Sequence, residues 1–261
     1  DLNGFSLSLS LNWADGTPAY SNNLTIINAV TMDDPGDQIQ TGTTITFSGG
    51  LSVESGSISA SGGKISLGNT SSITAEGMLD AGNANLELNA GLNVTSSGTL
   101  KINNDTTLTL NNNPLDFSGG AAASGGVLEA SGVLNLDGIT LDDKSTIKIN
   151  ADTTITSATQ LTVNTVDLGT HFLMLGSETT DLTIAGSLTI NYPGPNGLNS
   201  GDANLTLNGP VNVLEGGILS SGGTVTFGAG SNGASFSEVR SGLLLEDTTL
   251  VLQTALDLPY L

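Results

Sequence analysis

Carboxylates are the side chains best placed to do chemistry in this chain, and three pairs of them are adjacent: Asp33-Asp34, Asp142-Asp143 and Glu246-Asp247. Glycoside hydrolysis needs two positioned acids, so each pair is a candidate. Adjacent residues of a strand point to opposite faces, however, and adjacent acids in a turn are usually solvated. We therefore predict no catalytic residue and expect a protein that is not an enzyme.

Basic residues are scarce, because Lys64, Lys101, Lys144, Lys148 and Arg240 are all that the chain contains. A solenoid polysaccharide lyase needs a Lys or Arg base beside acids, and only Lys144 and Lys148 flank an adjacent acid pair. The chain has 5 basic and 25 acidic residues, which gives a net charge of −20. Such a chain repels nucleic acids and anionic bilayers, so we expect neither as a partner.

One acidic cluster suggests a cation site, namely Asp33, Asp34 and Asp37 in the turn Asp33-Asp-Pro-Gly-Asp37. Hard cations such as calcium take oxygen ligands from carboxylates and carbonyls in loops. The spacing matches neither a helix-loop-helix calcium loop nor the calcium-binding nonapeptide repeat. Two interpretations stay open, a solvated turn and a calcium site, and calcium is the only cofactor that the sequence suggests.

Sulfur, imidazole and aromatic chemistry are sparse as well. The chain has no Cys and a single His171, which removes thiolate sites and most zinc or His-based catalysis. Sugar-binding surfaces usually use exposed aromatic rings, and loops on a rigid scaffold often carry recognition. Tyr192, in the Pro-containing segment 192–201, is therefore the aromatic residue that we expect to contact a ligand.

The elements that must position these residues are short strands. From Thr43 onward the chain consists of runs with apolar, polar and apolar residues in turn, such as Ile45-Thr-Phe47 and Leu86-Glu-Leu88. Period-two alternation of branched and Thr residues favours strands, and the frequent Gly between runs breaks helices. We predict an all-β chain.

The runs recur in groups of three, with a period of about 22 residues between Ile45 and Val225. Such a period fits one coil of a parallel β-solenoid with three short strands per coil, a right-handed β-helix by the rule for parallel crossovers. Three segments also align with one another, each with two apolar pairs around a Gly-containing corner: 85–94, 181–190 and 204–213. The group starts are Ile45, Ile65, Leu86, Leu108, Leu134, Ile155, Leu182, Leu205 and Val225.

The two ends differ from the repeats, which divides the chain into residues 1–42, 43–242 and 243–261. Phe5, Leu7, Leu9, Leu11 and Trp13 alternate with polar residues and form the longest strand signal. Residues 1–42 are either a cap over the exposed strand edges or an assembly region whose first strand pairs with a neighbouring subunit. Residues 243–261 are a cap or a continuation of the solenoid.

Several repeats resemble a known family: Gly98-Thr-Leu-Lys-Ile102, Gly186-Ser-Leu-Thr-Ile190 and Gly223-Thr-Val-Thr-Phe227. In a Cys-free, Lys-poor chain rich in Ser, Thr, Asn and Gly, they look like the β-helical passenger domains of bacterial autotransporters and filamentous-haemagglutinin-type adhesins. The resemblance covers roughly residues 43–250. It implies a right-handed β-helix displayed on or released from a cell surface, with a role in adhesion or self-association.

We therefore expect an extracellular or cell-surface solenoid with a structural or adhesive role, a self-assembling subunit of a fibre or sheath. The expected partners are further copies of the chain, a neighbouring surface protein, or a host or matrix glycan. No run approaches 18 apolar residues, so no transmembrane segment is expected. The alternative is a carbohydrate-active β-helix, either a polysaccharide-degrading enzyme or a receptor-binding spike.

Overall fold

The computed structural model describes residues 6–9, 23–102, 106–119, 124–177, 179, 181–231, 235–236 and 242–254. Within these ranges the chain forms strands β1 to β31 and no helix. The paired strands run parallel and lie roughly 21 residues apart in the sequence, with three sheets per coil and about 10 turns in total. The predicted parallel β-solenoid is confirmed.

The chain divides into two compact units. The first comprises Asp1–Leu128 with Gly138–Thr140, and the second comprises Glu129–Asp137 with Leu141–Leu261.

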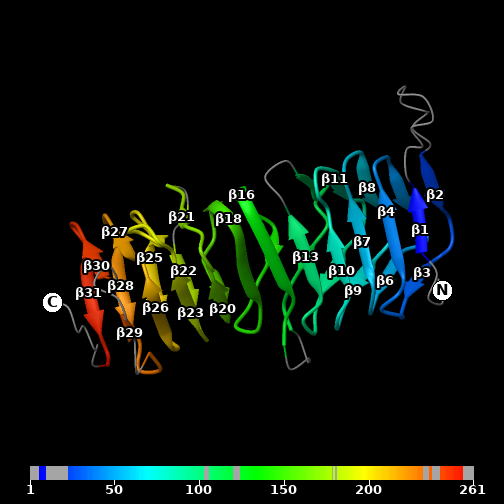
Figure 1. Cartoon of the computed structure of the whole chain (residues 1–261). Helices are drawn as coiled ribbons and strands as arrows, with labels where there is room; N and C mark the ends of the chain where they lie inside the picture. Colours follow the sequence, from blue (N-terminus) through cyan, green and yellow to red (C-terminus); the bar gives the residue numbers. More distant parts are fainter. Residues whose placement is uncertain are drawn as a thin grey trace. The chain divides into compact units, whose positions relative to one another are not determined.

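Unit 1 has three walls of stacked strands (Figure 1). The first wall contains β1 (Ser6–Leu9), β4 (Gln38–Thr41), β7 (Ser57–Ala60), β10 (Met78–Asp80) and β13 (Thr99–Ile102). The second wall contains β2 (Leu24–Ile26), β5 (Ile45–Phe47), β8 (Lys64–Leu67), β11 (Asn85–Leu88) and β14 (Thr107–Thr109). The third wall contains β3 (Val30–Met32), β6 (Leu51–Val53), β9 (Ser71–Ile73), β12 (Leu92–Val94), β15 (Leu115–Asp116) and β17 (Ile139–Thr140).

The core of unit 1 consists of columns of inward side chains. Ile45, Ile65, Leu86 and Leu108 occupy equivalent positions in four successive strands of the second wall, as the period predicts. The first three of these side chains have no exposed area. Because each buried Leu or Ile stabilises the fold by about 1.5–3 kcal/mol, the columns supply the driving force for coiling. The polar residue between two inward ones faces outward, which explains the alternation in the sequence.

Unit 2 also has three walls (Figure 1). The first contains β16 (Val127–Asn135) from Glu129 onward, the first part of β18 (Thr146–Thr156), β20 (Thr165–Asp167), β23 (Leu188–Asn191), β26 (Val211–Glu215) and β29 (Ser235–Phe236). The second contains the last part of β18, β21 (Leu173–Leu175), β24 (Leu198–Asn199), β27 (Gly217–Ser220) and β30 (Gly242–Leu245). The third contains β19 (Leu161–Val163), β22 (Asp181–Ile184), β25 (Asn204–Leu207), β28 (Thr224–Phe227) and β31 (Thr249–Leu252).

Unit 2 confirms one part of the predicted repeat alignment and corrects another. Leu182, Leu205 and Val225 form one column, as expected. Ile155 does not belong to that column, because it pairs with Leu175 on the second wall while Leu161 pairs with Leu182. The long gap that the sequence shows between Ile155 and Leu182 is therefore a change of wall and not an insertion.

The strand pairing of the solenoid extends beyond the central repeats on both sides. Strands β2, β3 and β4, which precede residue 43, pair in parallel with β5, β6 and β7. Strands β30 and β31, which follow residue 242, pair in parallel with β27 and β28. The boundaries suggested by the sequence at residues 43 and 242 therefore do not coincide with a break in the strand pairing.

Glycine is required where corners of neighbouring coils touch. Gly209 lies directly on Gly186 of the preceding coil, and a Cβ at Gly209 would clash with the carbonyl oxygen of Gly186. Both residues belong to the aligned segments 181–190 and 204–213. The shared corner glycine of these segments therefore reflects close backbone approach between coils.

Candidate functional site

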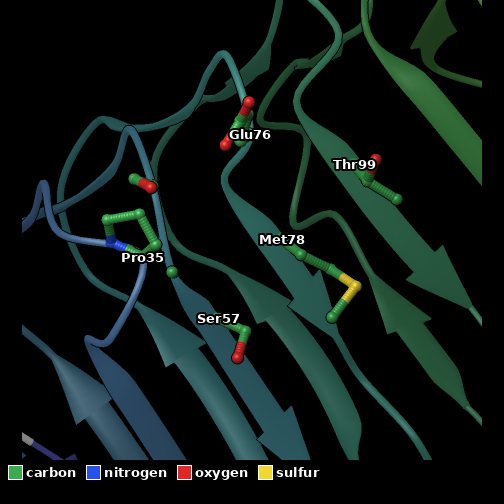
Figure 2. A pocket seen from close by; sticks show the side chains of 7 residues that line it. Pro35, Ser57, Glu76, Met78 and Thr99 are labelled. Atoms are coloured by element: carbon green, nitrogen blue, oxygen red, sulfur yellow. The ribbon is translucent and has the colours of Figure 1, made fainter.

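The described residues of unit 1 form an open hollow of about 310 Å³ on the outer face of the first wall. We name it the Met78 hollow. Figure 2 shows Met78 and Ser57 between Pro35 on one side and Thr99 on the other, with Glu76 on the corner above. These residues come from four successive coils, since β4, β7, β10 and β13 are neighbours. Its lining consists of Pro35, Ser55, Gly56, Ser57, Glu76, Met78 and Thr99.

The hollow arises from unequal corner lengths between the third and first walls. The corner between β6 and β7 contains only residues 54–56, whereas the neighbouring corners contain residues 33–37 and 74–77. The short corner therefore lies between a longer corner that carries Pro35 and another that carries Glu76. Gly56 permits this arrangement, because its φ is +82° and a Cβ there would lie 2.9 Å from the carbonyl oxygen of Asp34.

Four polar groups of the hollow have no partner in the part of the chain that the structure describes. The hydroxyls of Ser55, Ser57 and Thr99 and the carboxylate of Glu76 form no hydrogen bond or ion pair with these residues. The apolar side of the hollow is formed by Met78, which points outward from β10, and by the ring of Pro35. The hollow thus combines an apolar strip with unpaired hydroxyls and one carboxylate.

The acidic turn beside the hollow is stabilised by its own backbone. Asp37 is fully buried, and its Oδ2 accepts hydrogen bonds from the backbone N–H groups of Asp33 at 3.2 Å and Asp34 at 3.3 Å. Asp34 Oδ1 in turn accepts a 2.7 Å hydrogen bond from the N–H of Gly36. These contacts hold the turn that presents Pro35. The described residues contain no group of three or more His, Cys, Asp or Glu arranged to hold a metal ion, and calcium at this turn stays a prediction.

The adjacent acid pair at Asp142 lies in a similar turn. Asp142 Oδ1 accepts hydrogen bonds of 3.0 Å from the N–H of Lys144 and from the hydroxyl of Ser145. Lys148, the other base considered for a lyase site, forms a 3.1 Å ion pair with Glu129 of unit 2. Asp142 therefore caps a turn, while Lys148 neutralises an acid on a neighbouring strand.

Two further lysines form the same kind of pair between coils of unit 1. Lys64 Nζ lies 2.7 Å from Glu87 Oε2, and Lys101 Nζ lies 2.9 Å from Asp80 Oδ2. The hydrogen bond from Lys64 is the main cause that lowers the pKa of the Glu87 carboxyl, and the amide of Asn111 contributes to the shift. In contrast to these acids, Glu76 has no cationic partner among the described residues.

Tyr192 follows β23 in unit 2 and packs against a second ring. The centroids of Tyr192 and Phe172 are 6.2 Å apart, with the ring planes tilted by 42°. Both side chains and the adjacent His171 are half-buried. The Pro-containing segment 192–201 is only partly a loop, since Leu198 in β24 pairs with Leu173. Contact of Tyr192 with a ligand stays a prediction.

The predicted assembly strand lies only partly within the described residues. Leu7 and Leu9 belong to β1, opposite Ile39 and Thr41 of β4. Phe5, Leu11 and Trp13 lie outside the described residues. In the described part of the sheet β1 is the outermost strand, so one of its edges has no partner strand there.

The last described strands of unit 2 expose side chains that are buried elsewhere in the same columns. Leu250 stacks on Val225, and Leu252 stacks on Phe227. Val225 and Phe227 have no exposed area, whereas Leu250 is 41% and Leu252 is 50% exposed. Leu244 in β30 is 51% exposed too, but it pairs with the outward Leu219 and does not belong to a buried column. Strand β31 thus presents half-exposed inward side chains, an apolar surface that we name the β31 end and that is formed by Leu250 and Leu252.

The residues of the Met78 hollow are not among those that the sequence suggests as functional. Two signals were present in the chain: the corner of residues 54–56 is shorter than its neighbours, and Met78 occupies an outward position next to the inward Leu79.

Comparisons of the chain with models of protein families, with curated proteins and with solved structures give no match. Over the ranges that the structure describes, no helix has the length and apolar character to cross a membrane.

Proposed function

We propose that this protein is a non-enzymatic β-solenoid of the extracellular space or cell surface that serves as a structural or adhesive module and self-associates through its ends. The fold that it shares with β-helical passenger domains and adhesins supports this proposal. The Met78 hollow has a single carboxylate, whereas glycoside hydrolases generally use two, so the proposal assigns it a role in binding and not in catalysis.

The β31 end is the observation that carries the self-association. Inward Leu side chains at this end are half-exposed, and a parallel strand with apolar residues at alternate positions would cover them. The first strands of the chain have this pattern, as in β2, where Leu24 and Ile26 are only half-buried and flank an exposed Thr25. The partner proposed for the β31 end is therefore the N-terminal coil of a second copy.

The experiment is to measure the mass of the purified chain by light scattering over a range of concentrations, together with negative-stain electron microscopy. We expect the mass to rise with concentration and L250K/L252K to abolish the rise. The matched control is V251K, which adds a lysine on the outward side of the same strand, where Val251 is 36% exposed. Deletion of residues 1–13, which removes β1 from the N-terminal coil and leaves β2, is expected to weaken the rise.

Two outcomes would contradict the proposal. The first is a wild-type chain that stays monomeric at every concentration. The second is association that V251K weakens as much as L250K/L252K does, because a specific end-to-end contact depends on the inward side chains and not on added charge.

A further inference from the structure

We propose that the Met78 hollow binds a short segment of a neutral glycan chain. This inference rests on the adhesive part of the proposed function and names the ligand of that adhesion. It does not depend on self-association, which uses the β31 end.

The chemistry of the lining matches that of a sugar chain. A sugar ring presents a face of C–H groups and a rim of hydroxyls. Met78 and Pro35 supply apolar surface for the C–H face of the sugar, while the hydroxyls of Ser57 and Thr99 are free to form hydrogen bonds with the sugar hydroxyls. The carboxylate of Glu76 adds an ionised acceptor, which makes a stronger hydrogen bond with a hydroxyl donor than a neutral acceptor does.

The charge of the hollow and its few carboxylate ligands exclude an anionic ligand and a bare calcium ion. No Lys, Arg or His lines the hollow, and the chain carries a net charge of −20, so an anionic ligand would be repelled. A metal ion would find only one carboxylate there, and calcium takes six to eight oxygen ligands. Among uncharged ligands, a neutral saccharide has both the C–H face and the many hydroxyls that this lining matches.

The dimensions favour a short oligosaccharide over a single sugar. The lining spans four coils, and coils are about 4.8 Å apart, so the hollow is about 14 Å long. Its volume of about 310 Å³ lies at the small end of the range for ligand sites, and its open form buries little of the ligand. We therefore expect dissociation constants in the millimolar range that decrease as the chain lengthens from one to three sugars.

The site is preformed. Ser57, Met78 and Thr99 are in strands whose registers fix their spacing, with Met78 directly between the other two. Glu76 lies in a turn closed by a 2.9 Å hydrogen bond from the N–H of Gly77 to the carbonyl of Thr74. Little conformational entropy is therefore lost in the protein when a glycan binds.

The experiment uses the full chain and titrates it with neutral mono-, di- and trisaccharides of glucose, mannose, galactose and N-acetylglucosamine. Binding is followed by the shifts of backbone amide resonances in NMR spectra. At least one neutral trisaccharide is expected to shift the resonances of Ser57, Met78 and Thr99. Trigalacturonic acid, an anionic trisaccharide, is expected to leave them in place.

Two pairs of variants locate the binding. S57F fills the hollow and is expected to abolish binding, whereas S59F places the same ring two residues further along β7, outside the lining, and leaves it unchanged. E76Q keeps the shape and removes the charge, with an expected loss of about fivefold in affinity. Its control is E54Q, an exposed acid of the short corner that does not line the hollow.

The inference is overturned if no neutral saccharide shifts these resonances, or if S59F and E54Q weaken binding as much as S57F and E76Q. Measuring the sugar titration on L250K/L252K separates the two proposals. Sugar binding by that variant supports the hollow whether or not the wild-type chain associates, and association without sugar binding leaves the structural role standing while refuting the glycan site.

Discussion

The exposure of the β31 end predicts that one substitution has different costs at two positions of the same column. Leu205 and Leu250 both stack against Val225, Leu205 with no exposed area and Leu250 with 41% exposed. Replacing either by Ala removes three carbon atoms, worth about 2.5 kcal/mol when fully buried at about 0.8 kcal/mol per carbon. Any difference in the cost to the free energy of unfolding therefore comes from the burial of the two positions.

At Leu205 the substitution leaves a closed cavity, which raises the expected cost to about 3–4 kcal/mol, within the range found for buried Leu to Ala changes. At Leu250 only about three-fifths of the side chain is buried and solvent fills the space, so we expect about 1.5 kcal/mol. The predicted gap is about 2 kcal/mol in the free energy of unfolding of the monomeric chain.

Urea denaturation followed by far-ultraviolet circular dichroism measures both costs, with dilute protein to keep the chain monomeric. The gap should narrow at concentrations where the chain associates, because a second copy then covers Leu250. Equal costs for L205A and L250A in dilute protein would refute the reasoning, since they would mean that Leu250 is as well covered in the monomer as Leu205.

Two other substitutions test the contacts between coils. Because Lys64 lowers the pKa of the Glu87 carboxyl below 4.5, the pair stabilises the fold above that pH and the gain is lost as the pH falls through the folded-state pKa. K64M should move the pKa of Glu87 back toward 4.5 in an NMR titration, and an unchanged value would contradict the assigned cause. G209A should lower the free energy of unfolding by more than 1 kcal/mol through its clash with the preceding corner, whereas G242A, with nothing within 4 Å of its Cβ, should change it by less than about 0.5 kcal/mol. Equal effects in urea denaturation would contradict close packing at this corner.

The sequence was sufficient for the fold class because the signal is local and repeated. An inward residue at Ile45 requires inward residues at Ile65 and Leu86, so each coil repeats the evidence of the one before it. The prediction was wrong at Ile155, where the apolar pattern is the same but the strand belongs to another wall. The periodicity shows where strands recur along the chain. Because the short strands of all three walls have the same apolar pattern, it does not show which wall each strand joins.

The Met78 hollow could not be predicted from the sequence for a related reason. The Met78 hollow depends on the difference in length between neighbouring corners, and a difference of one or two residues is hidden in a period that already varies. The sequence also suggests Asp33, Asp34 and Asp37 as cation ligands, which stays a prediction; the structure adds that Asp37 is buried and accepts hydrogen bonds from backbone N–H groups of its own turn.

The sequence by itself thus determined which residues face the core, because alternation along a strand is a property of the backbone alone. It also determined the excess of negative charge and the scarcity of bases. Only the tertiary structure decided which outward residues meet, since partners such as Lys64 and Glu87 are 23 positions apart in the chain but lie on adjacent coils. Stacking converts that separation into direct contact, and the same stacking brings Pro35, Ser57, Met78 and Thr99 into one hollow.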